Sequence, residues 1–190
     1  MRIDPKWDPL IFCVVFSVVC LVVTYLAIND IKKENYSMDF RERLEQELIK
    51  WECGATRLEK LLTVRTDGGG LVVGAGHDVL QSEKLELGDK ISLGQMSRLF
   101  TVDVNSALDG ASGLIKNLQS HPEPVQVVVC AMIFQMGKRG VSKFKKMISA
   151  INNRDYELAS KEMLDSHWAR QTPHRAQAMS LLIRQRGSWN

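Results

Sequence analysis

The chain has 190 residues, enough for one domain with a hydrophobic core. Its formal net charge is +3 at pH 7, an excess too small to indicate nucleic acid as a partner. The four cysteines and four histidines show no spacing typical of a metal site, so neither a metal nor a cofactor is expected.

An uncharged, apolar segment, PLIFCVVFSVVCLVVTYLAI, occupies residues 9–28. About 20 such residues are enough for a helix to cross a bilayer. A cleaved signal peptide would need a shorter apolar core and a small-residue cleavage site, which Ala27 followed by Asn29 matches poorly. We therefore expect an uncleaved transmembrane helix here, preceded by a short N-terminus (1–8) and followed by a polar linker (29–38).

The first helix after the linker is predicted by apolar residues at helical spacing from Phe40 to Trp51. Gly54 follows this pattern, and glycine commonly ends a helix. Glu52 is therefore expected at the C-terminal end of the helix, next to the point where the chain reverses.

Short strands and tight turns are predicted next, because TDGGGLVVGAGHDVL (66–80) alternates glycines with short apolar pairs. A long helix is expected after Ser92, which forms a capping-box pattern with Gln95. Apolar residues then recur at helical spacing up to Val104.

The second half of the chain is predicted to be helical. Residues 124–137 are apolar on nearly every side, and although the valines suit a strand, the length of the segment favours a buried helix. Two short amphipathic helices are expected over 142–152 and 155–166, and Thr172–Pro173 opens a last helix. The expected fold class is α+β, one domain over 39–190 with a small β-containing N-terminal lobe, a larger helical C-terminal lobe and a long helix joining them.

Glu52 and Asp67 are the candidates for paired acid chemistry. Glycoside hydrolysis needs one protonated carboxyl group that donates to the leaving oxygen and a second, ionised one that acts on water or the sugar. Trp51 would give Glu52 a drier environment, whereas the glycines beside Asp67 leave it in water, and such a difference separates pKa values. Acids at this spacing are common by chance, so two solvated surface charges are the alternative interpretation.

Further motifs occur in a fixed order along the chain. They are GAGH (74–77), RLFTVDV (98–104), FQMGKRGVSKF (134–144), SHWARQTPHRA (166–176) and IRQRGSW (183–189). Together they closely resemble the lysozymes of T-even phages and related phage muramidases, most specifically in the second half. The resemblance implies a peptidoglycan hydrolase that cleaves the β-1,4 bond between N-acetylmuramic acid and N-acetylglucosamine and so lyses a bacterial host.

The resemblance also implies roles for individual residues. Glu52 matches the general acid, and Asp67 the second carboxylate, which helps a water attack from the opposite face with inversion. Gln135 matches a residue that lines the sugar cleft, and Arg175 matches an arginine that lies against the catalytic glutamate. Both are expected to contribute to substrate binding.

The choice of acid is between Glu52 and Glu59. Gly54 closes the first helix beside Glu52 as in the family, but the spacing from Glu52 to Asp67 is longer than the family's, and that from Glu59 is close to it. We favour Glu52, because the helix end fixes the position of the acid and a longer loop costs little. Glu59 would then be a solvated bystander.

His77 and Asp103 match two residues that pair in the family, and they are expected to tie the strand lobe to the long helix. Val72 stands where the family has a threonine implicated in positioning the attacking water, and valine has no hydrogen-bonding group. Thr66 is the candidate substitute. The alternative function is therefore a membrane-tethered, weak or inactive lysozyme-like protein that binds peptidoglycan.

The expected topology comes from the function, because the basic residues flanking the apolar segment are nearly balanced. Peptidoglycan lies outside the inner membrane of the host, so a single-pass protein would place its catalytic domain in the periplasm, as a monomer. A disulfide from Cys53 to Cys13 or Cys20 would block the site until release, and the alternative is that all the cysteines are free thiols. The sequence does not decide whether the anchor is released, or whether the protein acts in infection rather than in lysis.

Overall fold

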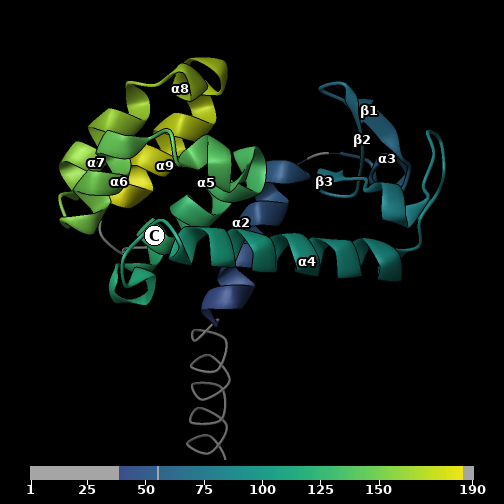
Figure 1. Ribbon diagram of the computed structural model, residues 1–190, viewed down its shortest axis with the longest axis horizontal. Helices are drawn as coiled ribbons and strands as arrows, with labels where there is room; N and C mark the ends of the chain where they lie inside the picture. Colours follow the sequence, from purple (N-terminus) through teal and green to yellow (C-terminus); the bar gives the residue numbers. More distant parts are fainter. Residues whose placement is uncertain (1–38, 55, 186–190) are drawn as a thin grey trace, which may run out of the picture. The chain divides into compact units, whose positions relative to one another are not determined.

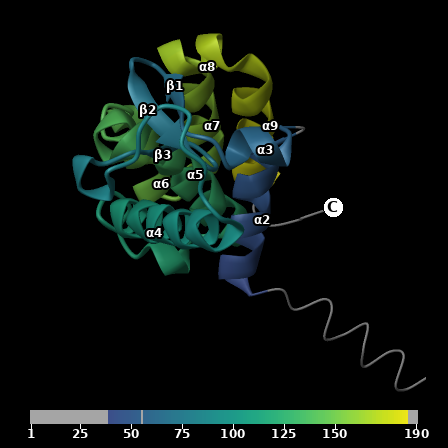
Figure 2. The same cartoon turned by 90° about the vertical axis from the view of Figure 1, so that its right-hand side faces the viewer.

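The computed structural model describes residues 39–54 and 56–185 (Figures 1 and 2). The predicted N-terminus (1–8), transmembrane helix (9–28) and linker (29–38) lie outside the described residues. None of the helices that the described residues form combines the length and the hydropathy needed to cross a bilayer.

The N-terminal part begins with a helix whose apolar face packs on the core. Leu44 and Leu48 are fully buried, and Phe40 and Trp51 pack against the same cluster, as the spacing predicted. A short second helix and a three-stranded antiparallel sheet of order β1-β2-β3 follow. The elements are α2 (Phe40–Glu52), α3 (Leu58–Leu61), β1 (Arg65–Asp67), β2 (Gly70–Val73), β3 (His77–Asp78) and the 3-10 helix η1 (Gln81–Glu83).

The connection between β1 and β2 is a two-residue turn. Gly68 and Gly69 have φ values of 55° and 92°, a backbone region that glycine adopts without steric cost. Asp67 pairs with Gly70 across the ladder, so it is the last residue of β1 before the turn. The turn that the glycines form therefore fixes Asp67 at the end of β1.

The long helix α4 (Leu93–Ser112) begins at the predicted cap. Ser92 Oγ accepts a hydrogen bond from the Gln95 amide, and the Gln95 side chain accepts one from the Ser92 amide. The helix α4 contacts both β3 and the following helix α5 (Glu123–Val141), and Figure 1 shows it running below both the strands and the helical part. It is the predicted connecting helix.

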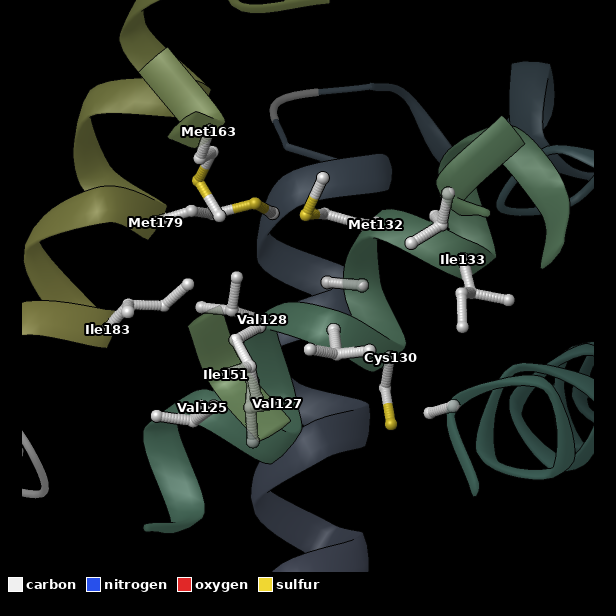
Figure 3. Close-up of a cluster of buried hydrophobic side chains, with 14 of the residues drawn as sticks. Val125, Val127, Val128, Cys130, Met132, Ile133, Ile151, Met163, Met179 and Ile183 are labelled. Carbon is white, nitrogen blue, oxygen red and sulfur yellow. The ribbon is translucent and has the colours of Figure 1, made fainter. Parts of the chain in front are cut away.

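The helical part packs around α5, which is buried on nearly every side up to Ile133. At Gly137 the backbone leaves the helical region, with φ 71° and ψ 161°, before helical structure resumes. Figure 3 shows Met132, Met163 and Met179 pointing toward one another in the core. The remaining elements are η2 (Leu118–Ser120), α5 (Glu123–Val141), α6 (Lys145–Asn152), α7 (Tyr156–Leu164), α8 (His167–Gln171) and α9 (Pro173–Gln185).

A separate, smaller core lies under the strands and consists of Val64, Val73 and Ile91. The mixed helical and sheet architecture with a small three-stranded sheet agrees with the predicted fold class. The short helix α8 was not predicted. It fills the gap before α9, beginning at the Ser166 side chain, which accepts a hydrogen bond from the Ala169 amide.

Candidate active site

Glu52 is the last residue of α2, and its carboxyl group is largely shielded from water. Its Oε1 accepts a hydrogen bond from Arg175 Nη1 at 2.8 Å, and Arg175 Nη2 donates to the carbonyl oxygen of Trp51. The two side chains are only 15% and 18% exposed. The expected contact between Arg175 and this glutamate is therefore present in the structure.

The ends of two helices bring this pair together. Glu52 is the last residue of α2, and Gly54, with φ 48°, turns the chain away while its amide bonds to the Ile49 carbonyl. Arg175 lies in the first turn of α9, which begins at Pro173. The predicted helix boundaries thus place both side chains at the same point.

Burial raises the pKa of Glu52, and the charge and hydrogen bond of Arg175 offset only part of this effect. The carboxyl group therefore keeps a proton to a higher pH than an exposed glutamate does. A raised pKa is what a proton donor near neutral pH requires. Arg175 at the same time restricts where the carboxyl group points.

Asp67 lies exposed at the end of β1. Residues along a strand alternate between its two faces, and directly paired residues share a face. Because Arg65 pairs with Val72, the side chains of Arg65, Asp67 and Val72 lie on one face, and those of Thr66 and its partner Leu71 on the other.

Val73 alternates with Val72 and is buried in the small core, so the face of Asp67 points away from that core. Val72 is nevertheless only 5% exposed. Thr66, exposed on the opposite face, is therefore poorly placed to replace a hydroxyl at Val72. The spacing of these residues in the sequence did not show that Thr66 and Val72 lie on opposite faces of the sheet.

Gln135 contacts the aromatic side chain of Trp168, whose Nε1 donates to Gln135 Oε1 at 3.0 Å. Trp168 also meets the ring of Phe144 edge to face, with centroids 6.3 Å apart. The amide of Gln135 is thus held in place near the break in α5 at Gly137. This contact supplies a fixed polar group on the helical part.

Glu59 lies in a different environment from Glu52. Its side chain is 81% exposed, and its Oε1 lies 3.5 Å from Lys90 Nζ. Such an exposed pair contributes little to stability, and the Glu59 carboxyl group lacks the shielding from water that Glu52 has. This placement favours Glu52 as the acid.

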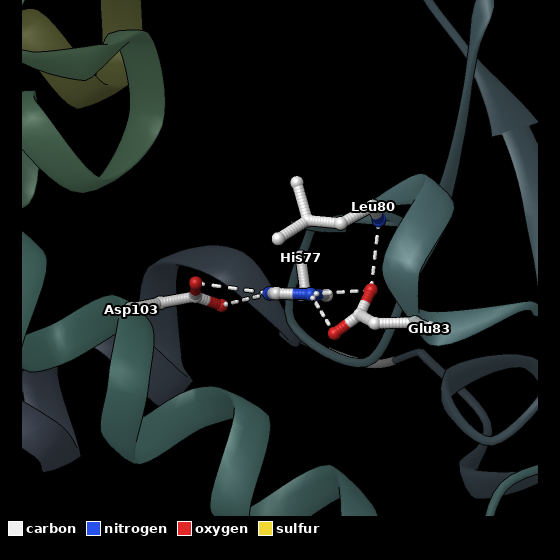
Figure 4. A network of polar contacts seen from close by, with 4 residues as sticks. All are labelled: His77, Leu80, Glu83 and Asp103. Atoms are coloured by element: carbon white, nitrogen blue, oxygen red, sulfur yellow. Dashed lines mark hydrogen bonds and ion pairs between the residues drawn. The ribbon is translucent and has the colours of Figure 1, made fainter.

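His77, on β3, contacts two carboxyl groups, that of Asp103 on α4 and that of Glu83 on η1 (Figure 4). Its Nδ1 lies 2.9 Å from Asp103 Oδ1, and its Nε2 lies 3.1 Å from Glu83 Oε1. Burial alone would lower the pKa of His77, but the hydrogen bonds and charges of Asp103 and Glu83 outweigh it and raise the pKa. The predicted pairing of His77 with Asp103 is confirmed.

Glu83 was missed as a partner of His77. It also accepts a hydrogen bond from the Leu80 amide at 2.8 Å, so η1 fixes its side chain beside the imidazole. The available signal was a glutamate three residues after Leu80, the spacing at which a side chain can reach back to a backbone amide.

Both described cysteines are free thiols. Burial, followed by the charge of Glu52, raises the pKa of Cys53, and Arg65 opposes this change. Burial raises the pKa of Cys130 to about 12. The proposed disulfide partners Cys13 and Cys20 lie outside the described residues. Within residues 39–54 and 56–185, no three His, Cys, Asp or Glu side chains gather as metal ligands would.

The fold and this site define a helical protein with a small sheet and a shielded, arginine-bound carboxyl group. No family model matches the chain. It is 29% identical over 136 residues to the peptidoglycan hydrolase gp36 of Pseudomonas phage phiKMV, a match that covers 71% of this chain and 15% of that protein.

Two similar proteins come from Dictyostelium discoideum. Probable T4-type lysozyme 2 is 33% identical over 107 residues, which covers 53% of this chain and 60% of that protein. Probable T4-type lysozyme 1 is 24% identical over 160 residues, with 73% and 92% covered. The chain thus spans less than two thirds of the length of the first two of these three relatives.

Proposed function

We propose that this protein is a peptidoglycan hydrolase of the lysozyme type, which cleaves the β-1,4 bond between N-acetylmuramic acid and N-acetylglucosamine. The observation that carries the proposal is the shielded Glu52 carboxyl group, which has a raised pKa and is held by Arg175. The similarity to proteins named as a peptidoglycan hydrolase and as probable T4-type lysozymes supports the same reaction.

In the proposed reaction, Glu52 donates its proton to the glycosidic oxygen, and the bond from that oxygen to the anomeric carbon breaks. A water molecule then bonds to the anomeric carbon and gives a proton to the Asp67 carboxylate. Both carboxyl groups return to their starting states by exchange with solvent. The different exposure of Glu52 and Asp67 suits these two roles.

Gln135 and Arg175 are proposed to contribute to substrate binding. The hydrogen bond from Trp168 fixes the oxygen of the Gln135 side chain, so its amide nitrogen is the group offered to a sugar oxygen. Arg175 orients Glu52, and its contact with the Trp51 carbonyl keeps the guanidinium at the end of α2. A preoriented acid needs no rearrangement when a substrate binds.

Product analysis tests the proposal directly. The full-length protein is incubated with purified Gram-negative peptidoglycan, and the soluble products are reduced and examined by mass spectrometry. Disaccharide-peptide products that end in reduced N-acetylmuramic acid are expected. Products ending in reduced N-acetylglucosamine, or cleavage confined to the peptides, would contradict the assigned bond.

A catalytically weak protein that binds peptidoglycan is the second candidate. The observation that favours it is Val72, a nearly buried apolar side chain on the face that carries Asp67, with Thr66 on the opposite face. Binding to peptidoglycan without release of soluble products would support this candidate over the enzyme.

We also propose that residues 9–28 anchor the protein in the inner membrane of a bacterial host, with the lysozyme-like part in the periplasm as a monomer. The uncharged sequence of this segment supports the anchor. Peptidoglycan lies outside the inner membrane, and this supports placing the lysozyme-like part in the periplasm. Carbonate extraction of membranes and protease protection in spheroplasts test both points, and a protein found wholly in the soluble fraction would contradict the anchor.

A further inference from the structure

Arg65 is a second arginine beside the candidate site, and the proposed reaction gives it no role. It begins β1, pairs with Val72, and shares a strand face with Asp67. Its Nη2 donates to the carbonyl oxygen of Gly74 at 3.3 Å, which ties the guanidinium to the end of β2. Arg65 is therefore held on the same face as the proposed second carboxylate.

The other terminal nitrogen of this guanidinium finds no acceptor among the residues that the structure describes. Nη1 of Arg65 is buried and forms no hydrogen bond with any residue in the part of the chain that the structure describes. A buried, charged N–H group without an acceptor is costly, and such groups call for a specific explanation. By contrast, both terminal nitrogens of Arg175 have acceptors.

Two observations place the Arg65 side chain next to the proposed site. A surface hollow of about 480 Å³ along the edge of β1 is lined by Lys60, Arg65, Asp67 and Leu87, among others. The charge of Arg65 also acts on the Cys53 thiol, which directly follows Glu52. Arg65 thus shares a strand face with Asp67 and lies close enough to Cys53, the residue after Glu52, for its charge to lower the pKa of that thiol.

We propose that Arg65 is a substrate-binding residue whose half-buried side chain turns on ligand binding, so that Nη1 donates a hydrogen bond to an acyl or carboxylate oxygen of the bound glycan strand. This inference rests on the proposed function. A guanidinium donates strongly to such oxygens because the hydrogen bond is charge-assisted. The oxygen belongs either to an N-acetyl group of the sugar or to a stem peptide, and both present the same chemistry.

The test uses binding, so that it does not depend on turnover. Full-length Glu52→Gln protein and the double variant Glu52→Gln/Arg65→Met are titrated with chitin hexasaccharide and with soluble, peptide-bearing glycan fragments. We expect at least a roughly tenfold weaker affinity in the double variant. Loss with both ligands assigns the oxygen to the sugar, and loss with the peptide-bearing ligand alone assigns it to the stem peptide.

Arg57→Met in the same Glu52→Gln background is the matched control, because it removes an exposed positive charge from the same lobe. We expect unchanged binding for it. Arg65→Met should change Tm little, because the lost hydrogen bond to the Gly74 carbonyl is offset by removal of a buried donor that lacks an acceptor. In otherwise wild-type protein, Arg65→Lys should raise KM more than it lowers kcat.

Equal binding by the two proteins, or a fall in Tm with unchanged affinity, would overturn the role of Arg65 and leave the proposed function intact. If Glu52→Gln protein binds neither ligand, and wild-type protein releases no products, the proposed function fails and the inference fails with it.

Discussion

Arg175 Nη1 and Glu52 Oε1 lie 2.8 Å apart, although the two residues stand near opposite ends of the described chain. Their contact closes α9 onto the end of α2 and leaves the carboxyl group mostly shielded from water. Because burial outweighs the arginine, the group combines a fixed orientation with a raised pKa. The proposed acid chemistry depends on this combination.

Replacing Arg175 should move the pH dependence of the reaction. Arg175 lowers the pKa of Glu52 against the effect of burial, so Arg175→Met should raise that pKa further and shift the basic limb of the kcat profile to higher pH. The maximum rate should fall because the carboxyl group loses its orientation. Rates measured on peptidoglycan from pH 4 to 9 test this. Arg170→Met, an exposed change on α8, is the control, and an unchanged basic limb in Arg175→Met would contradict the coupling.

Stability should depend on pH through His77. Its pKa is raised in the folded protein, so its contribution is fully present below the unfolded value of about 6.5 and is lost as pH rises through the folded pKa. Urea unfolding of wild type and His77→Gln should therefore show a difference that is largest below pH 6 and shrinks at higher pH.

Replacing Glu83, the second carboxyl group beside His77, tests the same pH dependence of stability. Its carboxyl group contributes to raising the pKa of His77, so Glu83→Gln should move the loss of stability to lower pH while the contact with Asp103 remains. Exposed His167→Gln is the control and should leave the pH dependence unchanged. A wild-type stability curve that is identical to that of His77→Gln at all pH values would contradict this account.

Packing of the apolar face of α2 against the core should fix the position of Glu52 at the end of that helix. Leu48 is fully buried in the main core, so Leu48→Ala should lower the free energy of unfolding by about 2–5 kcal/mol. The neighbouring Ile49 is 50% exposed, and Ile49→Ala should have an effect within about 1 kcal/mol. Chemical denaturation of both variants measures the difference, and equal losses would show that the assigned helix face is wrong.

Val72→Thr should report on the water-positioning role that the resemblance to T-even lysozymes implies for this position. The hydroxyl would lie on the face of Asp67, so we expect a several-fold higher turnover on peptidoglycan. The same change introduces a polar group at a nearly buried site and should lower stability by about 1–3 kcal/mol. Thr66→Val, on the opposite face, should leave turnover unchanged, and a loss there would contradict the assigned register.

Local sequence signals predicted much of the fold. Gly54 after an amphipathic run placed the end of α2, and the Ser92–Gln95 pattern placed the start of α4, because caps and periodicity act within a few residues. The glycines around β2 likewise predicted a turn. The position of Glu52 at a helix end was therefore accessible from the sequence.

Contacts between distant segments were less accessible. The pairing of His77 with Asp103, and of Glu52 with Arg175, was expected only from the resemblance to a known family. The second partner of His77 and the unpaired nitrogen of Arg65 were missed, because both depend on how side chains turn once strands and helices have packed. Strand alternation could have placed Arg65 beside Asp67, but only with the register known.

The most direct test compares two glutamates that lie close together in the sequence. Glu52→Gln and Glu59→Gln are made in the full-length protein, checked for equal Tm, and assayed for release of reducing ends from purified peptidoglycan. We expect Glu52→Gln to lose at least roughly a thousandfold in rate, and Glu59→Gln, whose side chain is exposed beside Lys90, to keep wild-type activity. Full activity in Glu52→Gln, or loss in Glu59→Gln alone, would contradict the assignment of the acid.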